Sequence, residues 1–260
     1  MAEKQRLPDS MAALPNVSAL MSLIEKCEAR AEHLPGIGVY FGRAGLGKTS
    51  AATCAAIVQD VVHLEVRAIW NGKTLLLKIA LELGLKATEQ MTVNRLYDLV
   101  ASGLAQSNRT LVLDEADQMK PAMFEMVRTL HDETSVPLIL MGEETLPHQL
   151  EHSPRLHGRV LAWVGAAEAT MADVDMLAKI NARGIEIAGD LREDVLVASG
   201  HSHRYIATNL TLLRHLALAQ GLVRVGRADW GARAFHTGTA PAPRHLPLHK
   251  QRPARVRRAA

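Results

Sequence analysis

Residues 42–49, Gly-Arg-Ala-Gly-Leu-Gly-Lys-Thr, decide the fold, because they form a complete G-x-x-x-x-G-K-[ST] phosphate-binding loop. The apolar run 37–41 precedes the loop and indicates a buried strand, while residues 50–58 have the composition of a helix. A loop between a strand and a helix points its backbone amides at an anion. The stretch therefore predicts a nucleotide phosphate site rather than a chance glycine-rich turn.

Each residue type in this loop has a task at a nucleotide. The glycines let the backbone wrap around the phosphates, Lys48 reaches the outer phosphates, and the Thr49 hydroxyl is placed to bind Mg²⁺. The residues predicted to contact ATP or its magnesium ion are Gly42, Gly45, Gly47, Lys48, Thr49, Ser50 and Asp114. Of these, Thr49 and Asp114 are the predicted Mg²⁺ ligands.

An apolar run that ends in two adjacent carboxylates, residues 110–117 (TLVLDEAD), complements the loop. Asp114 would hold Mg²⁺ directly or through water, and Glu115 would polarise a water for attack on the γ-phosphate. Acids that merely end a solvated strand are the simpler alternative, but they would not explain the pairing with a phosphate loop. Adenylate and nucleoside kinases do not need this glutamate, since their nucleophile is a bound substrate. The two motifs together predict ATP hydrolysis.

The 260-residue chain, with 48% hydrophobic residues, is long enough for one α/β core and a small helical domain. Its two cysteines, Cys27 and Cys54, lack metal-ligand spacing, so reduced thiols are expected. The histidines show no metal-like pattern, although His201 and His203 flank Ser202. No uncharged run approaches the ~20 residues that span a bilayer, and no signal-type apolar core follows the N-terminus. We therefore expect a cytoplasmic protein that does not associate with membranes.

Positive charge is concentrated near the C-terminus. No acidic residue follows Asp229, whereas seven basic residues do, so the chain's net charge of +3 arises from this segment. The segment is also rich in proline and poor in periodic apolar positions, which predicts a disordered tail. It is either a polycationic arm for phosphate backbones or a solubilising tail without a specific partner. The candidate DNA contacts in it are Arg252, Arg255, Arg257 and Arg258.

Strand-like and helix-like patterns alternate through the first two thirds of the chain. Strands are predicted at 37–41, 63–68, 110–114, 137–141 and 159–164, and helices at 17–31, 50–58, 74–85, 93–104 and from 121. This alternation predicts an α/β fold with a five-stranded parallel sheet flanked by helices. Only helices are predicted afterwards, at 173–180, 191–198 and 204–219. We expect an N-terminal segment (1–35), a phosphate-loop domain (36–170), an all-α lid (171–226) and a basic tail (227–260).

The phosphate loop, the Leu-Asp-Glu-Ala-Asp strand end and the helical segment with residues 200–204 (GHSHR) resemble the AAA+ ATPases. More narrowly, residues 130–144 are similar to the target-DNA activators of Mu-like transposing bacteriophages, called transposition protein B, and to their transposon relatives. The similarity covers roughly residues 15–222. It implies an ATP- and Mg²⁺-dependent ATPase that oligomerises on double-stranded DNA and activates or directs a transposase in the cytoplasm of a bacterial host cell.

The resemblance also implies roles for three arginines. Arg159, ahead of the last strand, matches the arginine finger that enters the ATP site of the next subunit, and Arg155 is the competing candidate. Arg204 matches the second sensor arginine. With Lys48 and Glu115, Arg159 and Arg204 complete the predicted catalytic set. Each arginine could instead make only a surface ion pair.

An arginine supplied in trans makes assembly a requirement for hydrolysis, and head-to-tail contacts form rings or helical filaments. Lys73 and Lys120 are candidate contacts of such an assembly with the DNA backbone. Glu143 occupies a position where many AAA+ proteins carry a polar sensor, and an acid there would repel phosphate unless it turns away or serves a neighbour. Two alternatives stay open: a motor or loader in secretion or DNA replication, and a nucleotide switch with negligible turnover.

Overall fold

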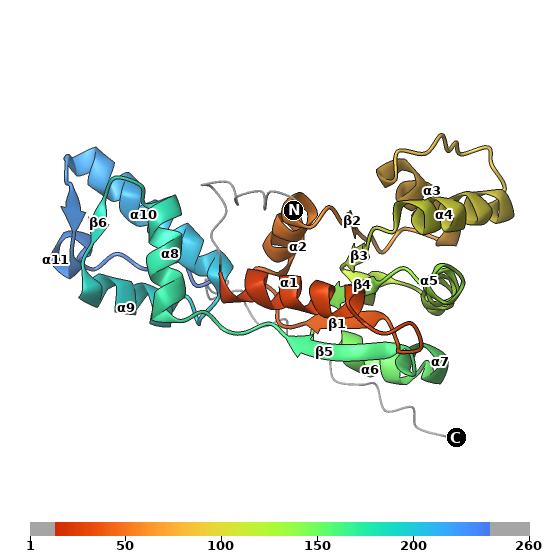
Figure 1. The fold of residues 1–260 in the computed structure, drawn as a ribbon. Helices are drawn as coiled ribbons and strands as arrows, with labels where there is room; N and C mark the ends of the chain where they lie inside the picture. Colours follow the sequence, from red (N-terminus) through yellow and green to blue (C-terminus); the bar gives the residue numbers. More distant parts are fainter. Residues whose placement is uncertain (1–13, 240–260) are drawn as a thin grey trace, which may run out of the picture.

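Five parallel strands form the sheet that carries the phosphate loop (Figure 1). The computed structural model describes residues 14–239. The strands are β1 (Ile37–Phe41), β2 (Val62–Glu65), β3 (Leu111–Asp114), β4 (Leu138–Gly142) and β5 (Val160–Gly165), arranged in the order β2-β3-β4-β1-β5. Every neighbouring pair is parallel. The predicted five-stranded parallel sheet is therefore confirmed.

Helices cover both faces of this sheet (Figure 1). One face packs against α1 (Pro15–Glu28) and α2 (Lys48–Val58). The other packs against α3 (Gly72–Glu82), α4 (Val93–Ser107), α5 (Pro121–Thr134), α6 (Leu146–Glu151) and α7 (Pro154–His157). In β1, Tyr40 contributes to the first core and Val39 to the second. The strands are buried on both sides because the crossover helices of a parallel sheet lie on its two faces.

Local signals fix where several helices begin. Asn71 and Thr92 cap α3 and α4, since each side-chain oxygen accepts a hydrogen bond from the backbone amide three residues later. Proline occupies the first turn of α1, α5, α6 and α7, where a missing amide hydrogen costs nothing. A 3-10 turn, η1 (Ala116–Gln118), follows β3. Asn71 and Pro121 thereby mark the starts of the helices that follow β2 and η1.

A second, mostly helical unit follows β5 and lies to the left in Figure 1. It contains α8 (Met171–Asn181), α9 (Gly189–Ala198), α10 (His203–Gln220) and α11 (Arg227–Trp230). Two short strands, β6 (Glu186–Ile187) and β7 (Arg224–Val225), pair in parallel within it. The prediction of an all-α lid is therefore wrong in this detail. A two-residue strand carries no alternation that a sequence pattern could reveal.

The lid also extends further than its predicted end at residue 226. Trp230 is 6% exposed, and its ring stacks on Phe235 with the ring centroids 5.0 Å apart. The Asn209 side chain binds both backbone polar groups of His236. The predicted start of the tail at residue 227 is thus too early. The residues after 226 pack through the aromatic pair Trp230 and Phe235, which lies outside the helices that show an apolar periodicity in the sequence. The four arginines predicted to contact DNA, Arg252, Arg255, Arg257 and Arg258, lie outside the described residues.

The lid and the α1–α2 face share one hydrophobic core. This core includes Leu20 of α1, Ala51 of α2, Val174 of α8 and Leu210 of α10. The lid is consequently held against the helix that follows the phosphate loop. Within residues 14–239, none of the helices has the length and apolar content required to cross a bilayer.

Candidate nucleotide site

The phosphate loop joins β1 to α2 and adopts a conformation that needs its glycines. Gly45 and Gly47 have φ angles of +84° and +82°, in the left-handed region that L side chains rarely adopt. Lys48 begins α2 and is 6% exposed. Its Nζ donates to the carbonyl oxygens of Gly42 at 2.7 Å and Arg43 at 3.1 Å. The buried ammonium group is therefore aimed back across the loop, where it is placed to meet an anion.

The acidic pair stands at the end of β3, beside the loop. Asp114 is fully buried, and its Oδ1 accepts a hydrogen bond from the Glu115 amide at 2.9 Å. Its Oδ2 has no hydrogen-bond partner among the described residues. A buried carboxylate oxygen without a donor is costly, and Mg²⁺ or one of its waters would satisfy it. The donor set of Asp114 and the Thr49 hydroxyl thus fits a magnesium ion.

Glu115 adopts a left-handed backbone conformation with φ of 54° and faces the same cavity as Lys48. Burial raises the pKa of its carboxyl group, and the negative charges of Asp114 and Asp117 raise that pKa further. The Lys48 ammonium group opposes the shift. A raised pKa makes a carboxylate a stronger base, which suits a group that must accept or orient a proton of water.

A cavity of about 250 Å³ opens between the loop and the lid. Its lining residues are Leu14, Ala44, Gly45, Gly47, Lys48, Thr49, Ser50, Glu115, Glu143, Leu177, His203, Arg204 and Ala207. The loop residues and Glu115 form the polar part of the wall, while Leu14, Leu177 and Ala207 supply an apolar part. The cavity thus offers a polar cradle next to an apolar surface, a combination suited to a nucleotide.

The first turn of α10 sits directly on the phosphate loop. The Arg204 amide donates to the Gly45 carbonyl oxygen at 3.1 Å, and Ser202 Oγ donates to the same oxygen at 3.3 Å. A Cβ added to Gly45 would lie 2.5 Å from Ser202 Oγ. Gly45 is therefore required both for its φ angle and for the close approach of the lid.

Asn16, a residue that the sequence did not single out, ties the loop to the segment that leads into the lid. Its Nδ2 donates to the carbonyl oxygens of Leu46 at 2.9 Å and Ala167 at 2.8 Å. Its Oδ1 accepts from the Ala167 amide at 2.8 Å, and the Tyr40 hydroxyl donates to its backbone oxygen. The one available signal was a polar residue in the first turn of an otherwise apolar helix face. Leu177 and Ala207 in the cavity wall had none.

The structure brings most of the predicted site together. Gly45, Gly47, Lys48, Thr49, Ser50, Glu115 and Arg204 all line the cavity, while Gly42 starts the loop and Asp114 lies buried next to Glu115. The Arg204 side chain is exposed and has no hydrogen bond or ion pair to any residue within 14–239. It is therefore available to a ligand.

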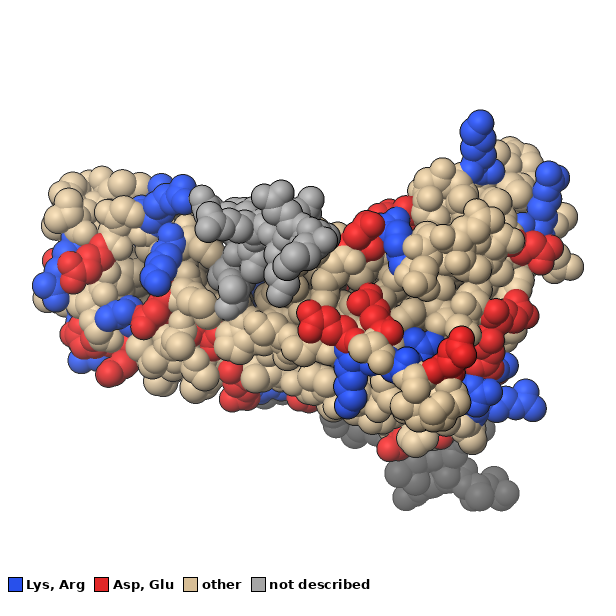
Figure 2. Space-filling view, viewed as in Figure 1, with Lys and Arg blue, Asp and Glu red and all other residues tan. Residues whose placement is uncertain are grey.

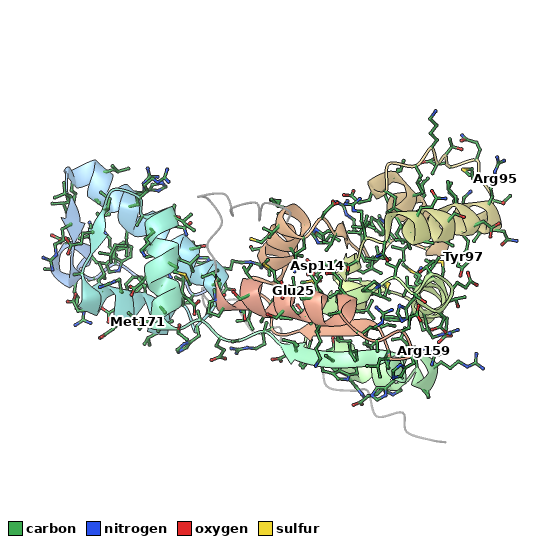
Figure 3. The ribbon with its side chains drawn as sticks, in the orientation of Figure 1. Glu25, Arg95, Tyr97, Asp114, Arg159 and Met171 are labelled. Carbon is green, nitrogen blue, oxygen red and sulfur yellow. The ribbon has the colours of Figure 1, made fainter. Side chains whose placement is uncertain are left out.

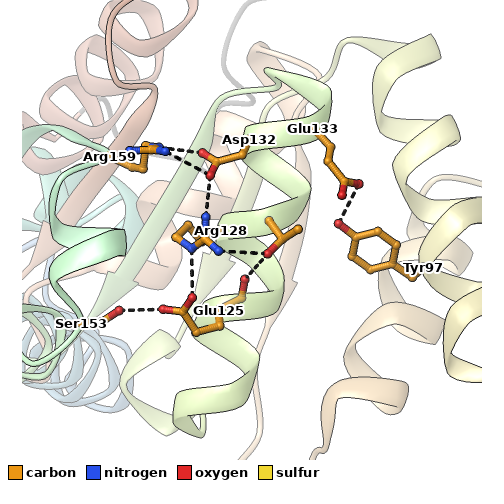
Figure 4. A network of polar contacts seen from close by, with 8 residues as sticks. Tyr97, Glu125, Arg128, Asp132, Glu133, Ser153 and Arg159 are labelled. Carbon is orange, nitrogen blue, oxygen red and sulfur yellow. Dashed lines mark hydrogen bonds and ion pairs between the residues drawn. The ribbon is translucent and has the colours of Figure 1, made fainter.

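Arg159 does not line this cavity. It precedes β5 at the amino end of the sheet, whereas the phosphate loop follows the carboxyl end of β1, and Figure 3 shows Arg159 well apart from Asp114. Its Nε donates to Asp132 Oδ1 at 2.7 Å, and Asp132 also accepts from Arg128 (Figure 4). Arg155 on α7 is exposed, and no described residue pairs with its side chain. Neither arginine reaches the cavity of its own chain.

The predicted DNA contacts within the described residues lie at the carboxyl edge of the sheet. Lys73 is the second residue of α3 and its Nζ donates to the Glu89 carbonyl oxygen, while Lys120 is exposed just before α5. A Cβ on Gly72 would lie 3.4 Å from the sulfur of Met126, so the start of α3 packs against α5. Figure 2 shows Lys and Arg interspersed with Asp and Glu on the face in view, not gathered in one basic patch.

Glu143 follows β4 and lines the cavity. Its backbone amide donates to Asp117 Oδ1 at 3.1 Å, and its charge contributes to the raised pKa of Glu115. The acid at the predicted sensor position thus faces the same space as the phosphate loop. It adds negative charge there, which Lys48 and a bound cation would have to offset.

The strand order and the motifs around this site match a known fold. A parallel sheet in the order β2-β3-β4-β1-β5, with a phosphate loop after β1, an acidic pair after β3 and flanking helices, is the α/β fold of AAA+ ATPases. Residues 31–150 match the family model described as an AAA domain. AAA+ ATPases generally bind ATP or ADP with Mg²⁺. The chain has no match among curated proteins.

Solved structures with the same fold include one protein in complex with DNA and a Holliday junction branch migration motor. Cdc6p from Pyrobaculum aerophilum has a TM-score of 0.67 at 16% identity, and the match covers 87% of this chain and 68% of that one. The Aeropyrum pernix Orc1 protein in complex with DNA has a TM-score of 0.62 at 16% identity, and the match covers 86% of this chain and 65% of that one. The Thermotoga maritima RuvB Holliday junction branch migration motor has a TM-score of 0.55 at 19% identity, and the match covers 86% of this chain and 70% of that one. The AAA+ resemblance is confirmed at the level of the fold, and transposition protein B stays a prediction.

Proposed function

We propose that the protein binds ATP with Mg²⁺ in the cavity between the phosphate loop and the lid, and hydrolyses it. The observation that carries this proposal is the convergence of Lys48, Thr49, Glu115 and Arg204 on one cavity. Asp114, next to Glu115, has an Oδ2 without a hydrogen-bond partner among the described residues. The Lys48 ammonium group offsets the charge of the outer phosphates. Bound Mg²⁺ would neutralise charge that develops on the phosphate oxygens.

In this proposal Glu115 orients the attacking water and accepts its proton. Its raised pKa makes it a better base than an exposed glutamate, although it must be ionised to act. Arg204, free of protein partners within the described chain, contacts the γ-phosphate from the lid. Hydrolysis removes that contact, so the nucleotide state would be sensed where the lid meets the loop.

We further propose that the active site is completed by an arginine from a neighbouring subunit. Arg159 and Arg155 both lie away from the cavity of their own chain, as a residue that acts in trans must. Arg159 would have to leave Asp132, whereas Arg155 is already unpaired among the described residues. Mixing a Glu115→Gln subunit with an arginine-deficient subunit tests this idea. If Arg159 or Arg155 acts in trans, the mixture of Glu115→Gln with the variant that lacks this arginine should hydrolyse ATP faster than either variant alone. If neither mixture recovers ATPase activity, the proposal is refuted.

The proposed ligand of the assembled ATPase is duplex DNA, bound with little sequence preference. The support is the fold shared with Orc1 in complex with DNA and with RuvB, the lysines at the carboxyl edge of the sheet, and the basic residues after Asp229. The described surface in view has no continuous basic patch, which is consistent with a binding site formed by several subunits or by the basic segment. The similarity of residues 130–144 to transposition protein B supports delivery of this DNA to a transposase.

Fluorescence anisotropy of a random-sequence duplex tests the DNA proposal. The conditions are ATP, ADP and the Lys48→Ala protein, each across a salt series. Binding that is tight, cooperative and salt-sensitive only with ATP and intact Lys48 is expected. Equal binding with ATP, ADP and Lys48→Ala would refute ATP-controlled DNA binding. The shared fold with Cdc6p favours a second candidate, a loader in DNA replication, and transposase stimulation in a strand-transfer assay separates the two.

A further inference from the structure

One buried side chain in the cavity wall has no role in the chemistry described so far. His203 is the first residue of α10, is 5% exposed and lines the cavity next to the phosphate loop. Both of its ring nitrogens are buried, and neither has a hydrogen-bond partner among the described residues. Buried polar atoms are nearly always paired in proteins, so an unpaired imidazole that faces a cavity indicates a missing partner.

A second unpaired atom lies beside this ring. Asp173 of α8 is 2% exposed, and its Oδ2 accepts hydrogen bonds from the Thr170 amide at 2.7 Å and the Thr170 hydroxyl at 2.8 Å. Its Oδ1 has no hydrogen-bond partner within residues 14–239 and lies 3.8 Å from His203 Nε2. A small movement of the ring would turn this 3.8 Å approach into a hydrogen bond. That bond would leave His203 Nδ1 as the nitrogen that still lacks a partner.

The His203 side chain lies against the phosphate loop. A Cβ added to Gly47 would lie 3.9 Å from both Cβ and Cγ of His203, so the side chain is in contact distance of the loop. In phosphate loops of this type the backbone amides at this point hold the α- and β-phosphates. The other charged groups that line the cavity are Lys48 of α2, Arg204 of α10, Glu115 after β3 and Glu143 after β4. An oxygen of a bound polyphosphate is therefore an acceptor of the right charge and place.

We propose that His203 is a nucleotide-binding residue, which donates from Nδ1 to an α- or β-phosphate oxygen while Asp173 accepts from Nε2. The inference rests on the proposed ATP site. Burial lowers the pKa of His203 and the Asp173 charge opposes that effect. A phosphate oxygen on the other side of the ring would be a second anion, and like the charge of Asp173 it would raise the pKa of His203. A ring held between two anions donates from both nitrogens, which pairs all three unsatisfied atoms at once.

The test measures binding of fluorescent ATP and ADP analogues to the full chain and to four variants. They are His203→Ala, His203→Gln, His215→Ala and Lys48→Ala. His215 lies on the same helix α10, is exposed and does not line the cavity, so it is a matched control. A hydrogen bond to a charged group has a strength that corresponds to a loss of about tenfold to a hundredfold in Kd. We expect this loss with His203→Ala for both nucleotides and a smaller one with His203→Gln, whose amide can still donate.

The outcomes separate this inference from the proposed function. Unchanged affinity of a folded His203→Ala protein, with Lys48→Ala strongly impaired, overturns the role of His203 and leaves the ATP site intact. Binding that is absent in the wild type, or equal in wild type and Lys48→Ala, overturns the proposed site itself. Circular dichroism shows whether His203→Ala folds. If it does not, His203→Gln is compared with His203→Leu, a variant without any donor, and wild-type affinity in His203→Leu would refute the contact.

Discussion

Replacing Gly45 by alanine tests whether the lid rests on the phosphate loop when no nucleotide is bound. Two separate costs are expected. An alanine at φ of +84° is strained by about 1–2 kcal/mol. The new Cβ would also lie 2.5 Å from Ser202 Oγ, so the hydroxyl must rotate away and lose its hydrogen bond to the Gly45 carbonyl oxygen. A lost bond of this type costs about 0.5–1.5 kcal/mol. We expect a total loss of about 2–3 kcal/mol in the free energy of unfolding.

Gly84→Ala is the matched control. Gly84 has a φ angle of +73°, yet no atom lies within 4 Å of an added Cβ, so only the strain of about 1–2 kcal/mol applies. The difference between the two variants isolates the contact with the lid. In a Ser202→Ala background the nearest atoms to the Gly45 Cβ are ordinary contacts at 3.6 Å, from the Cβ atoms of Ser202 and Arg204. Gly45→Ala should then cost no more than Gly84→Ala.

Urea denaturation of the wild type, the single variants and the Gly45→Ala/Ser202→Ala double variant gives the free energies of unfolding. The double-mutant cycle should yield a coupling energy of about 1 kcal/mol between Gly45 and Ser202, which exceeds the usual deviation for independent sites. A coupling energy near zero, or a loss at Gly45 equal to that at Gly84, would mean that the lid does not contact the loop in solution. The reasoning from the 2.5 Å approach would then be refuted.

Three further changes have defined outcomes. Glu115→Gln should abolish ATP hydrolysis but keep nucleotide binding, as measured by phosphate release and by titration. The pKa of Glu115 in the folded state is raised above 4.5, so its ionised form opposes folding at neutral pH. Glu115→Gln should therefore melt at a higher temperature than the wild type at pH 7. This gain in stability should disappear below about pH 4.5, where the wild-type carboxyl group is protonated in both the folded and the unfolded state. Trp230→Ala should lower the free energy of unfolding in urea by about 3–5 kcal/mol, since the ring is 6% exposed, whereas Trp163→Ala, at 37% exposed, should cost less. Asn16→Ala should lower the free energy of unfolding by about 1–3 kcal/mol and weaken nucleotide binding, because it removes the buried bond to the Leu46 carbonyl and the part-buried bonds to Ala167, and unchanged stability would contradict that role.

The parts of the site that are local in sequence could be predicted, because the physics that fixes them is local. A phosphate loop needs glycines at fixed offsets and a lysine at the start of the next helix, so residues 42–49 specify their own conformation. The acidic pair follows an apolar strand directly. The alternation of strands and helices likewise indicated the parallel sheet, since each segment carries its own periodicity.

The rest of the cavity wall depends on contacts between distant segments. Asn16 reaches Ala167 across most of the described chain, and His203 meets Asp173 from a different helix. Neither an asparagine nor a histidine indicates by its type alone which distant residue it contacts. A histidine among apolar residues is more often part of the core than a ligand. For the same reason, the sequence did not predict the two-residue strands β6 and β7 or the packing of Trp230. Only a three-dimensional arrangement reveals them.

Helix α10 links the phosphate loop to the end of the described chain. Its first residues contact Gly45 and Gly47, whereas its other end leads into β7 and the α11 segment. A helix of 18 residues is about 27 Å long, so a tilt of about 10° at the loop would move the far end by about 5 Å. Such a tilt requires that ATP and ADP interact differently with the lid, because a ligand shifts a conformational equilibrium only by its differential affinity. In the proposed function, the exposed Arg204 would supply that difference at the γ-phosphate, whereas the proposed contact of His203 with the inner phosphates would form with both nucleotides and keep the lid attached throughout the cycle.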